Sequence, residues 1–304
     1  MIPLKRHVNG EMPFHATGVG KISDDLEIFT KQQHEGNKIA ADWWKASKWR
    51  AFAERLLEES HGKCGYCEEK LGLKTPETNR ASVDHIRPKS KKEYQHLAYS
   101  YFNFVIACKK CNSSKSNSFE ILGREIEQPI VKIKTSGKKS HVKAKGFSID
   151  PKKLWAGWSS PLRIFDSSYQ KMSAEEKREQ PKLINPYFDQ PNKFFGYKIV
   201  QLDKGNVVEI YSLSKDDKSI MRADYTIKTL QLNRLELAQS RFKEYKQFQR
   251  VFTRVESAKK STFWKKKEKR RLKKKYLSAD QRFSGMFRFF GDQKEALHKK
   301  GRTT

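Results

Sequence analysis

The feature that most constrains this chain is a pair of CxxC motifs, Cys64 with Cys67 and Cys108 with Cys111, which hold its only four cysteines. A CxxC turn presents two sulfurs to one ion, and zinc prefers tetrahedral thiolate coordination. Two such turns supply a closed site, which leaves no position for water and is therefore structural. The rival interpretation, a redox CxxC, needs one pair and usually a βαβ context. We therefore expect a structural zinc clip.

The charge of the chain indicates a polyanionic partner. Its 304 residues include 64 Lys and Arg against 35 Asp and Glu, which gives a net charge of +29. Such an excess repels itself in a compact state, and nucleic acid is the partner that best explains it. An acidic membrane is the alternative, but no run approaches the roughly 18–20 apolar residues of a spanning helix, and no signal peptide opens the chain. We expect no membrane association and, because CxxC pairs indicate metal ligands in a reducing compartment, a cytoplasmic location.

Hydrophobic spacing predicts helices and one hairpin around the cysteine segment. Helical spacing extends over about 38–60. Two β-rich runs, 194–202 and 207–213, flank a turn that contains a glycine, which predicts a β-hairpin. The lysine-rich stretch 132–153 is compatible with either a flexible loop or a basic hairpin.

Two helix starts are predicted in the last third of the chain. Asn233 with Glu236 three residues later has the spacing of a capping box, and Ser278 with Gln281 repeats it. Between them lies the basic run 259–275, for which a merely solvated helix face and direct phosphate contact are both open. The predicted core stripe of the first helix is Leu235, Ala238, Phe242, Tyr245, Phe252 and Val255. The candidate nucleic-acid contacts in the basic run are Lys266, Lys267, Arg270, Arg271 and Lys274.

Polar side chains suited to catalysis lie between and just after the cysteines. Asp84 and His85 are adjacent in a short apolar stretch that predicts a strand, so they are expected on opposite faces. Asn112 follows the last cysteine at a predicted helix start, where its amide oxygen can join a carboxylate as a ligand of a hard cation. One turn further, Lys115 can neutralise a phosphate. Asn103, on a predicted turn, can tether the loop and orient the histidine. Each residue taken alone is more often an ordinary cap, turn or core residue.

The combination resembles a known family. Cys-Gly-Tyr-Cys, then Asp-His-Ile-Arg-Pro, then Asn-Phe-Val-Ile-Ala-Cys-Lys-Lys-Cys-Asn-Ser-Ser-Lys is similar to the HNH endonucleases with a ββα-metal fold. The resemblance implies that His85 is the general base, that Asp84 and Asn112 bind a catalytic Mg²⁺ or Mn²⁺, and that Asn103 orients the base. The four cysteines would bind structural zinc. The last motif position is Asn rather than His, and the Gly-Gly pair that many members have after the Asp-His strand is missing.

A second resemblance concerns the C-terminal half. Leu-Ile-Asn-Pro-Tyr-Phe-Asp, the predicted hairpin, and Thr-Ile-Lys-Thr-Leu-Gln-Leu-Asn-Arg-Leu-Glu-Leu are similar to HNH proteins of retron and Septu-type anti-phage systems. In those systems the nuclease works alongside an ATPase subunit. The resemblance implies an effector nuclease acting on DNA, with RNA left open. The alternatives are a non-catalytic zinc-containing module that binds nucleic acid, a free-standing restriction-type HNH nuclease, and a subunit latent until a partner acts.

These expectations define a fold class and a division of the chain. We expect an α+β protein with a ββα-metal HNH core and a four-cysteine zinc clip. An N-terminal segment, 1–60, is partly helical, and the nuclease domain covers 61–123. A basic region, 124–304, contains the hairpin and most of the helices, and would bind DNA or a partner.

Overall fold

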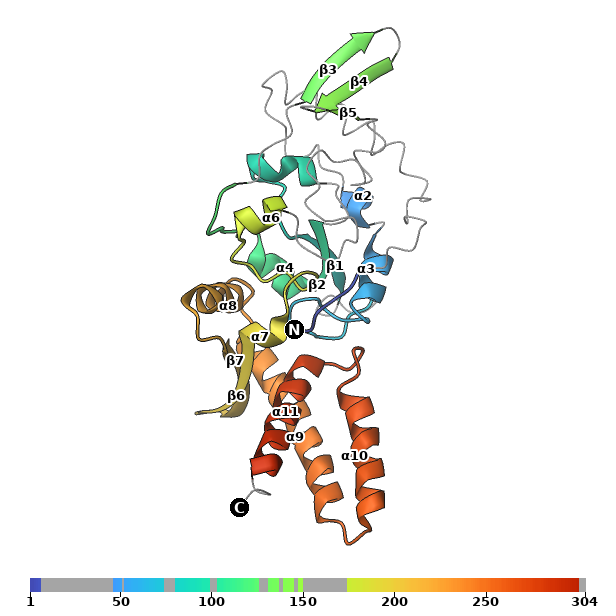
Figure 1. Cartoon of the computed structure of the whole chain (residues 1–304), viewed down its shortest axis with the longest axis vertical. Helices are drawn as coiled ribbons and strands as arrows, with labels where there is room; N and C mark the ends of the chain where they lie inside the picture. Colours follow the sequence, from blue (N-terminus) through green and yellow to red (C-terminus); the bar gives the residue numbers. More distant parts are fainter. Residues whose placement is uncertain are drawn as a thin grey trace.

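A computed structural model gives the fold of the chain (Figure 1). The first eight residues of the predicted helix over 38–60 lie outside the part that the structure describes. The described residues are 1–6, 46–50, 52–73, 80–98, 103–125, 131–136, 139–144, 147–149 and 174–300.

The cysteine segment folds as two antiparallel strands followed by a helix. Strand β1 (Ala81–His85) pairs with β2 (Phe104–Cys108), and helix α4 (Lys109–Lys115) follows β2 directly. All five residues of β2 are buried, because its apolar side chains are covered by α4 and by α3 (Ala53–Glu59). Cys108 caps α4, since its Sγ accepts a hydrogen bond from the backbone N–H of Cys111. The predicted ββα core is thus confirmed.

Short elements surround this core. Helix α2 (Ala46–Arg50) contacts β1, and the 3₁₀ helix η3 (Lys92–Leu97) lies in the connection between the two strands. Helix α6 (Ala174–Glu179) is tied to the connection by its last residue. Glu179 is fully buried and accepts hydrogen bonds from Arg87, including one of 2.5 Å from Nη2.

The lysine-rich stretch contains an antiparallel sheet. Strands β3 (Val131–Ser136), β4 (Lys139–Ala144) and β5 (Phe147–Ile149) pair in the order β3-β4-β5. In Figure 1 this sheet lies at the opposite end of the molecule from the C-terminal helices. Of the two alternatives for 132–153, the described part therefore agrees with the hairpin.

The predicted hairpin in the C-terminal half is also present. Helix α7 (Pro191–Phe194) leads into β6 (Phe195–Leu202), which pairs along its whole length with β7 (Gly205–Ser212). Gly205 takes a φ of +107° at the turn, a conformation that a residue with a Cβ rarely adopts. Helix α8 (Asp217–Thr229) packs against β7.

Three long helices complete the C-terminal region. Helix α9 (Leu235–Ser257) and α10 (Thr262–Tyr276) lie side by side, and α11 (Ser284–Lys300) packs near them (Figure 1). Phe248 of α9 joins the three, with ring centroids 5.1 Å from Tyr276 and 5.2 Å from Phe287. The predicted core stripe is mostly buried or partly buried, but Leu235 is exposed.

Both predicted capping boxes are wrong. Helix α9 begins at Leu235 with Arg234 at its N-cap, and the Asn233 side chain instead pairs with the backbone N–H and C=O of Ile210. Helix α11 begins at Ser284, because Phe283 interrupts the chain with a φ of +56°. Tertiary contacts therefore outweigh the local capping pattern at these positions.

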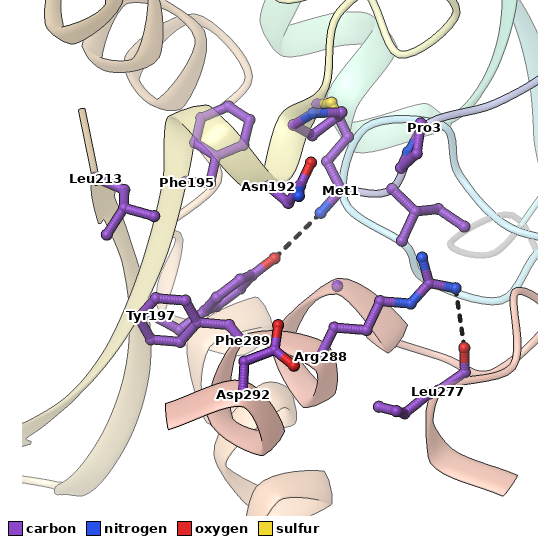
Figure 2. A pocket seen from close by; sticks show the side chains of 13 residues that line it. Met1, Pro3, Asn192, Phe195, Tyr197, Leu213, Leu277, Arg288, Phe289 and Asp292 are labelled. Carbon is purple, nitrogen blue, oxygen red and sulfur yellow. Dashed lines mark hydrogen bonds between the residues drawn. The ribbon is translucent and has the colours of Figure 1, made fainter. Parts of the chain in front are cut away.

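A pocket of about 670 Å³ lies between the first residues, the β6–β7 hairpin and α11 (Figure 2). Its wall is mainly apolar and includes Phe195, Leu213 and Phe289. At its edge the Met1 amine donates a hydrogen bond of 3.1 Å to the Tyr197 hydroxyl. In the described part of the chain, no helix combines the length and apolar character needed to cross a membrane.

Candidate active site and zinc clip

The four cysteines converge from three separate pieces of backbone. Cys64 and Cys67 lie in the turn between α3 and β1, Cys108 ends β2, and Cys111 is in the first turn of α4. All four are buried, and their Sγ atoms lie within 4.8 Å of one another. The Cys67 and Cys108 sulfurs are 3.8 Å apart, far too distant for a disulfide bond. Tetrahedral zinc with Zn–S bonds of about 2.3 Å requires a sulfur–sulfur edge of about 3.8 Å, so the cluster fits that ion.

The first CxxC turn packs directly on the second strand. Gly65 donates a backbone hydrogen bond of 2.9 Å to the Ile106 carbonyl. A Cβ at this glycine would lie 2.7 Å from the Val105 side chain, so the close approach requires glycine here. The clip therefore fixes the position of the strand pair and of the helix that follows.

Asp84 lies on the face of β1 that points towards the first CxxC turn and α4. It is 3% exposed. Its Oδ2 accepts a hydrogen bond of 2.6 Å from the Tyr66 hydroxyl, and its Oδ1 lies 3.1 Å from Lys115 Nζ. Burial raises the pKa of Asp84, although the lysine and the tyrosine act in the opposite direction. Each carboxylate oxygen carries two lone pairs, so these bonds leave acceptor capacity for a cation.

Lys115 does not lie on the surface as expected from the sequence. Its side chain is fully buried, and Nζ donates to Asp84 and, at 2.6 Å, to the carbonyl oxygen of His85. A phosphate contact needs an exposed ammonium, whereas this lysine joins α4 to β1. We therefore correct its assignment from phosphate contact to an internal partner of the carboxylate.

His85 lies on the opposite face of β1, as strand alternation predicts. Its ring packs edge-on against Trp49 of α2 and Phe104 of β2, with centroids 5.0 Å and 4.9 Å away. Burial lowers the pKa of His85 to about 3, so the imidazole is neutral near neutral pH. Its Nε2 lies 2.8 Å from the Ala98 carbonyl oxygen. Because a carbonyl only accepts, Nε2 must carry the proton, and Nδ1 keeps a free lone pair.

Asn103 holds the connection between the two strands. Its Oδ1 accepts from the Arg87 backbone N–H at 2.9 Å, and its Nδ2 donates to the Arg87 carbonyl at 2.9 Å and to the Leu97 carbonyl at 3.3 Å. Leu97 immediately precedes Ala98, whose carbonyl binds the His85 ring. Asn103 thus reaches the histidine through the backbone it fixes, without touching the ring in the described contacts.

The Asn112 side chain has a defined orientation. Ser82 Oγ donates to the Ala107 carbonyl at 3.0 Å, so it must accept the bond of 3.1 Å from Asn112 Nδ2. The amide NH₂ therefore faces Ser82, and the amide oxygen faces away from it. Ser82 and Asp84 share one face of β1, so a carboxylate and an amide oxygen, both hard donors, come from neighbouring parts of the ββα unit. This donor set fits Mg²⁺ or Mn²⁺.

Three contributors to these sites were not predicted from the sequence. Tyr66, inside the first CxxC turn, binds the Asp84 carboxylate, and Ser82 orients Asn112. Arg234 reaches the cysteine sulfurs from the start of α9. The period of two along β1 was a usable signal for Ser82, but no local pattern connects Arg234 with residues so far away in the sequence.

The candidate nucleic-acid contacts on α10 share one exposed face. At 3.6 residues per turn, positions 266, 267, 270, 271 and 274 lie on one side of the helix, and all five are exposed. Leu272 and Tyr276 are buried on the other side. Phe263 belongs to the basic side and is 78% exposed, so it is not a core residue. This face combines positive charge with an accessible aromatic ring.

The chain was compared with known families and proteins. Residues 64–118 match the family model described as HNH endonuclease. The Septu protein PtuB of Bacillus mycoides (strain KBAB4) is 25% identical over 212 residues, which cover 66% of this chain and 52% of the relative. The Septu protein PtuB of Bacillus thuringiensis is 29% identical over 99 residues, which cover 33% of this chain and 35% of the relative.

The aligned region therefore spans about half the length of one relative and about a third of the other. No solved structure matches the chain. The family match covers all four cysteines together with Asp84, His85, Asn103 and Asn112. The chain thus contains, in residues 64–118, an HNH endonuclease domain.

Proposed function

We propose that this protein is a divalent-metal-dependent endonuclease that hydrolyses phosphodiester bonds in DNA, with a zinc clip as its structural support. The observation that carries the proposal is the His85 ring, which is neutral, held at Nε2 by a backbone carbonyl, and free to accept a proton at Nδ1. A general base needs this protonation state and a fixed orientation. In the proposed division of the chain, 61–123 is the nuclease domain, 1–60 precedes it, and 124–304 binds DNA or a partner.

In this mechanism His85 takes a proton from the attacking water at Nδ1. The Ala98 carbonyl stabilises the imidazolium that results, because it accepts the Nε2 proton throughout. Asn103 acts as a positioning residue through the backbone on either side of the histidine. A divalent ion bound by Asp84 and Asn112 would stabilise the negative charge that develops on the phosphate and on the leaving 3′ oxygen.

The proposed substrate follows from charge. A net charge of +29 and the basic face of α10 suit a phosphate backbone, and Phe263 on that face can stack on an unpaired base. These features support nucleic acid and do not distinguish DNA from RNA, so RNA is the control substrate. The fully buried Lys115 takes no part in this proposed contact.

We further propose that the protein is the nuclease of a Septu-type anti-phage defence system and acts with an ATPase subunit. Two relatives named Septu protein PtuB support this assignment, as does the resemblance of the C-terminal half. Co-purification with the product of an adjacent ATPase gene tests the partnership. A chain that stays monomeric beside that product, and cleaves equally well without it, contradicts it.

The nuclease proposal is tested with supercoiled plasmid and single-stranded RNA, each with Mg²⁺, Mn²⁺ or EDTA. Wild-type protein is expected to nick or linearise plasmid with metal, and His85→Ala to be inactive while its circular dichroism spectrum stays unchanged. His61→Ala is a matched control, because His61 lies before the first CxxC turn and outside the site. Tight, salt-sensitive binding without cleavage by any variant, with or without the ATPase, would instead identify a zinc-containing binding module.

A further inference from the structure

Arg234 contacts the cysteine cluster from the other half of the chain. Its Nη1 lies 3.7 Å from Cys111 Sγ, and its Nη2 lies 3.8 Å from Cys67 Sγ and 3.9 Å from Cys108 Sγ. Arg234 is the residue before α9 and is 123 positions beyond Cys111. One guanidinium thus donates towards three of the four sulfurs.

The electrostatics of a zinc–thiolate site explain why a cation belongs here. Four thiolates around one Zn²⁺ leave a net charge of minus two, and all four cysteines are buried. A buried charge is unfavourable unless it is paired and hydrogen-bonded. A guanidinium is planar, keeps its charge, and offers several N–H donors at fixed angles, so it can serve more than one sulfur.

The backbone that carries Arg234 is held firmly in place. Its Nη1 also donates to the Gln231 carbonyl at 3.2 Å, and Gln231 takes a φ of +47°. Leu232 beside it is fully buried. On the adjoining position, Asn233 makes two hydrogen bonds of 2.8 Å with the backbone of Ile210 in β7. The side chain therefore projects from a rigid connection and not from a mobile loop.

We propose that Arg234 hydrogen-bonds the zinc-bound thiolates, increases zinc affinity, and couples the metal to the packing of the C-terminal helices on the HNH domain. The inference rests on the zinc site of the proposed function and is independent of the nuclease reaction. Groups that hydrogen-bond metal ligands orient and tune them, and replacing one typically lowers metal affinity by about 10–100-fold. Arg234→Ala is expected to weaken zinc binding by that factor.

The test begins with zinc content by mass spectrometry, followed by competition with a chromogenic chelator. The variants are Arg234→Ala, Arg234→Lys, and Arg234→Gln in case the alanine variant does not fold. Arg234→Lys should fall between wild type and Arg234→Ala, because an ammonium is a point charge without the fork of donors. The matched control is Arg222→Ala, which removes a partly buried ion pair with Asp189 in α8 and touches no sulfur in the described contacts. This control should lower thermal stability but leave zinc affinity unchanged.

Two readouts separate a direct contact from general destabilisation. In cobalt-substituted protein, the sulfur-to-cobalt charge-transfer band should shift in Arg234→Ala and stay fixed in Arg222→Ala. Hydrogen exchange at 230–234 should accelerate when zinc is removed from wild type, and much less so in Arg234→Ala, where the coupling is already absent.

The outcomes that overturn the inference are distinct from failure of the zinc proposal. Equal zinc affinity and an unshifted cobalt band in Arg234→Ala reject the contact, as does an equal loss of affinity in Arg222→Ala. Wild-type protein that contains no zinc rejects the zinc site itself, and this inference with it.

Discussion

Replacing Lys115 with methionine tests whether this lysine supports Asp84 inside the protein or contacts a phosphate. At an effective dielectric constant of about 20, the charges 3.1 Å apart attract each other by about 5 kcal/mol. Burial nevertheless raises the pKa of Asp84, so removing the carboxylate from water costs more than its neighbours return. The ion pair as a whole therefore adds little stability, but either charge left alone is strongly unfavourable.

Lys115→Met leaves the carboxylate buried with its counter-ion removed and is expected to lower the free energy of unfolding by about 3–5 kcal/mol. Asp84→Asn strands the lysine and should cost a similar amount. In the double variant neither charge remains, so the two losses should fail to add by about 1–3 kcal/mol.

Urea unfolding followed by tryptophan fluorescence measures the four proteins. Lys110→Met is the control, because Lys110 is an exposed lysine on the same helix. An unchanged urea midpoint in Lys115→Met, together with a larger loss of DNA affinity than in Lys110→Met, would refute the reasoning and restore the phosphate contact predicted from the sequence.

Three further predictions concern the asparagine, the histidine and the basic helix. Asn103→Ala should destabilise the fold by about 1–3 kcal/mol for each buried backbone group it leaves unpaired, and should lower the cleavage rate more than substrate affinity, as measured by urea unfolding and plasmid cleavage. Since burial lowers the pKa of His85 from 6.5 to about 3, the unfolded state binds a proton that the folded state lacks between these values. Stability should therefore fall by about 1.4 kcal/mol per pH unit as pH drops through this interval, and His85→Ala should remove that slope from the urea midpoints; an equal slope in both proteins argues against a buried neutral ring. Neutralising the basic face of α10 should reduce the slope of log affinity for duplex DNA against log salt by about 0.9 for each phosphate that the protein no longer neutralises, and an unchanged slope would assign the face to solvent. The residues changed are Lys266, Lys267, Arg270, Arg271 and Lys274.

The zinc clip and the ββα core were predictable because their signals are local. Spacing within each CxxC turn determines which sulfurs can meet, and the period of two along β1 separates Asp84 from His85. The hairpin of β6 and β7 was predictable for the same reason, since a glycine turn joins two β-rich runs.

Burial was the property that the sequence did not reveal. Lysine is almost never fully buried unless it is paired, so Lys115 was expected at the surface, and its partner Asp84 was expected to be available only to metal. The capping box at Asn233 failed for a related reason. The asparagine has a better use in tertiary structure, where both of its amide groups pair with β7.

The two sites depend on each other through residues that belong to both. Tyr66 lies between the first two cysteines and binds the carboxylate proposed to hold the catalytic ion. Asn112 directly follows the last cysteine, and Arg234 approaches the sulfurs from the C-terminal helices. Loss of zinc would therefore displace a hydroxyl, an amide and a guanidinium together. Such a loss should abolish cleavage before the helical region unfolds, because α9, α10 and α11 have an aromatic core of their own around Phe248.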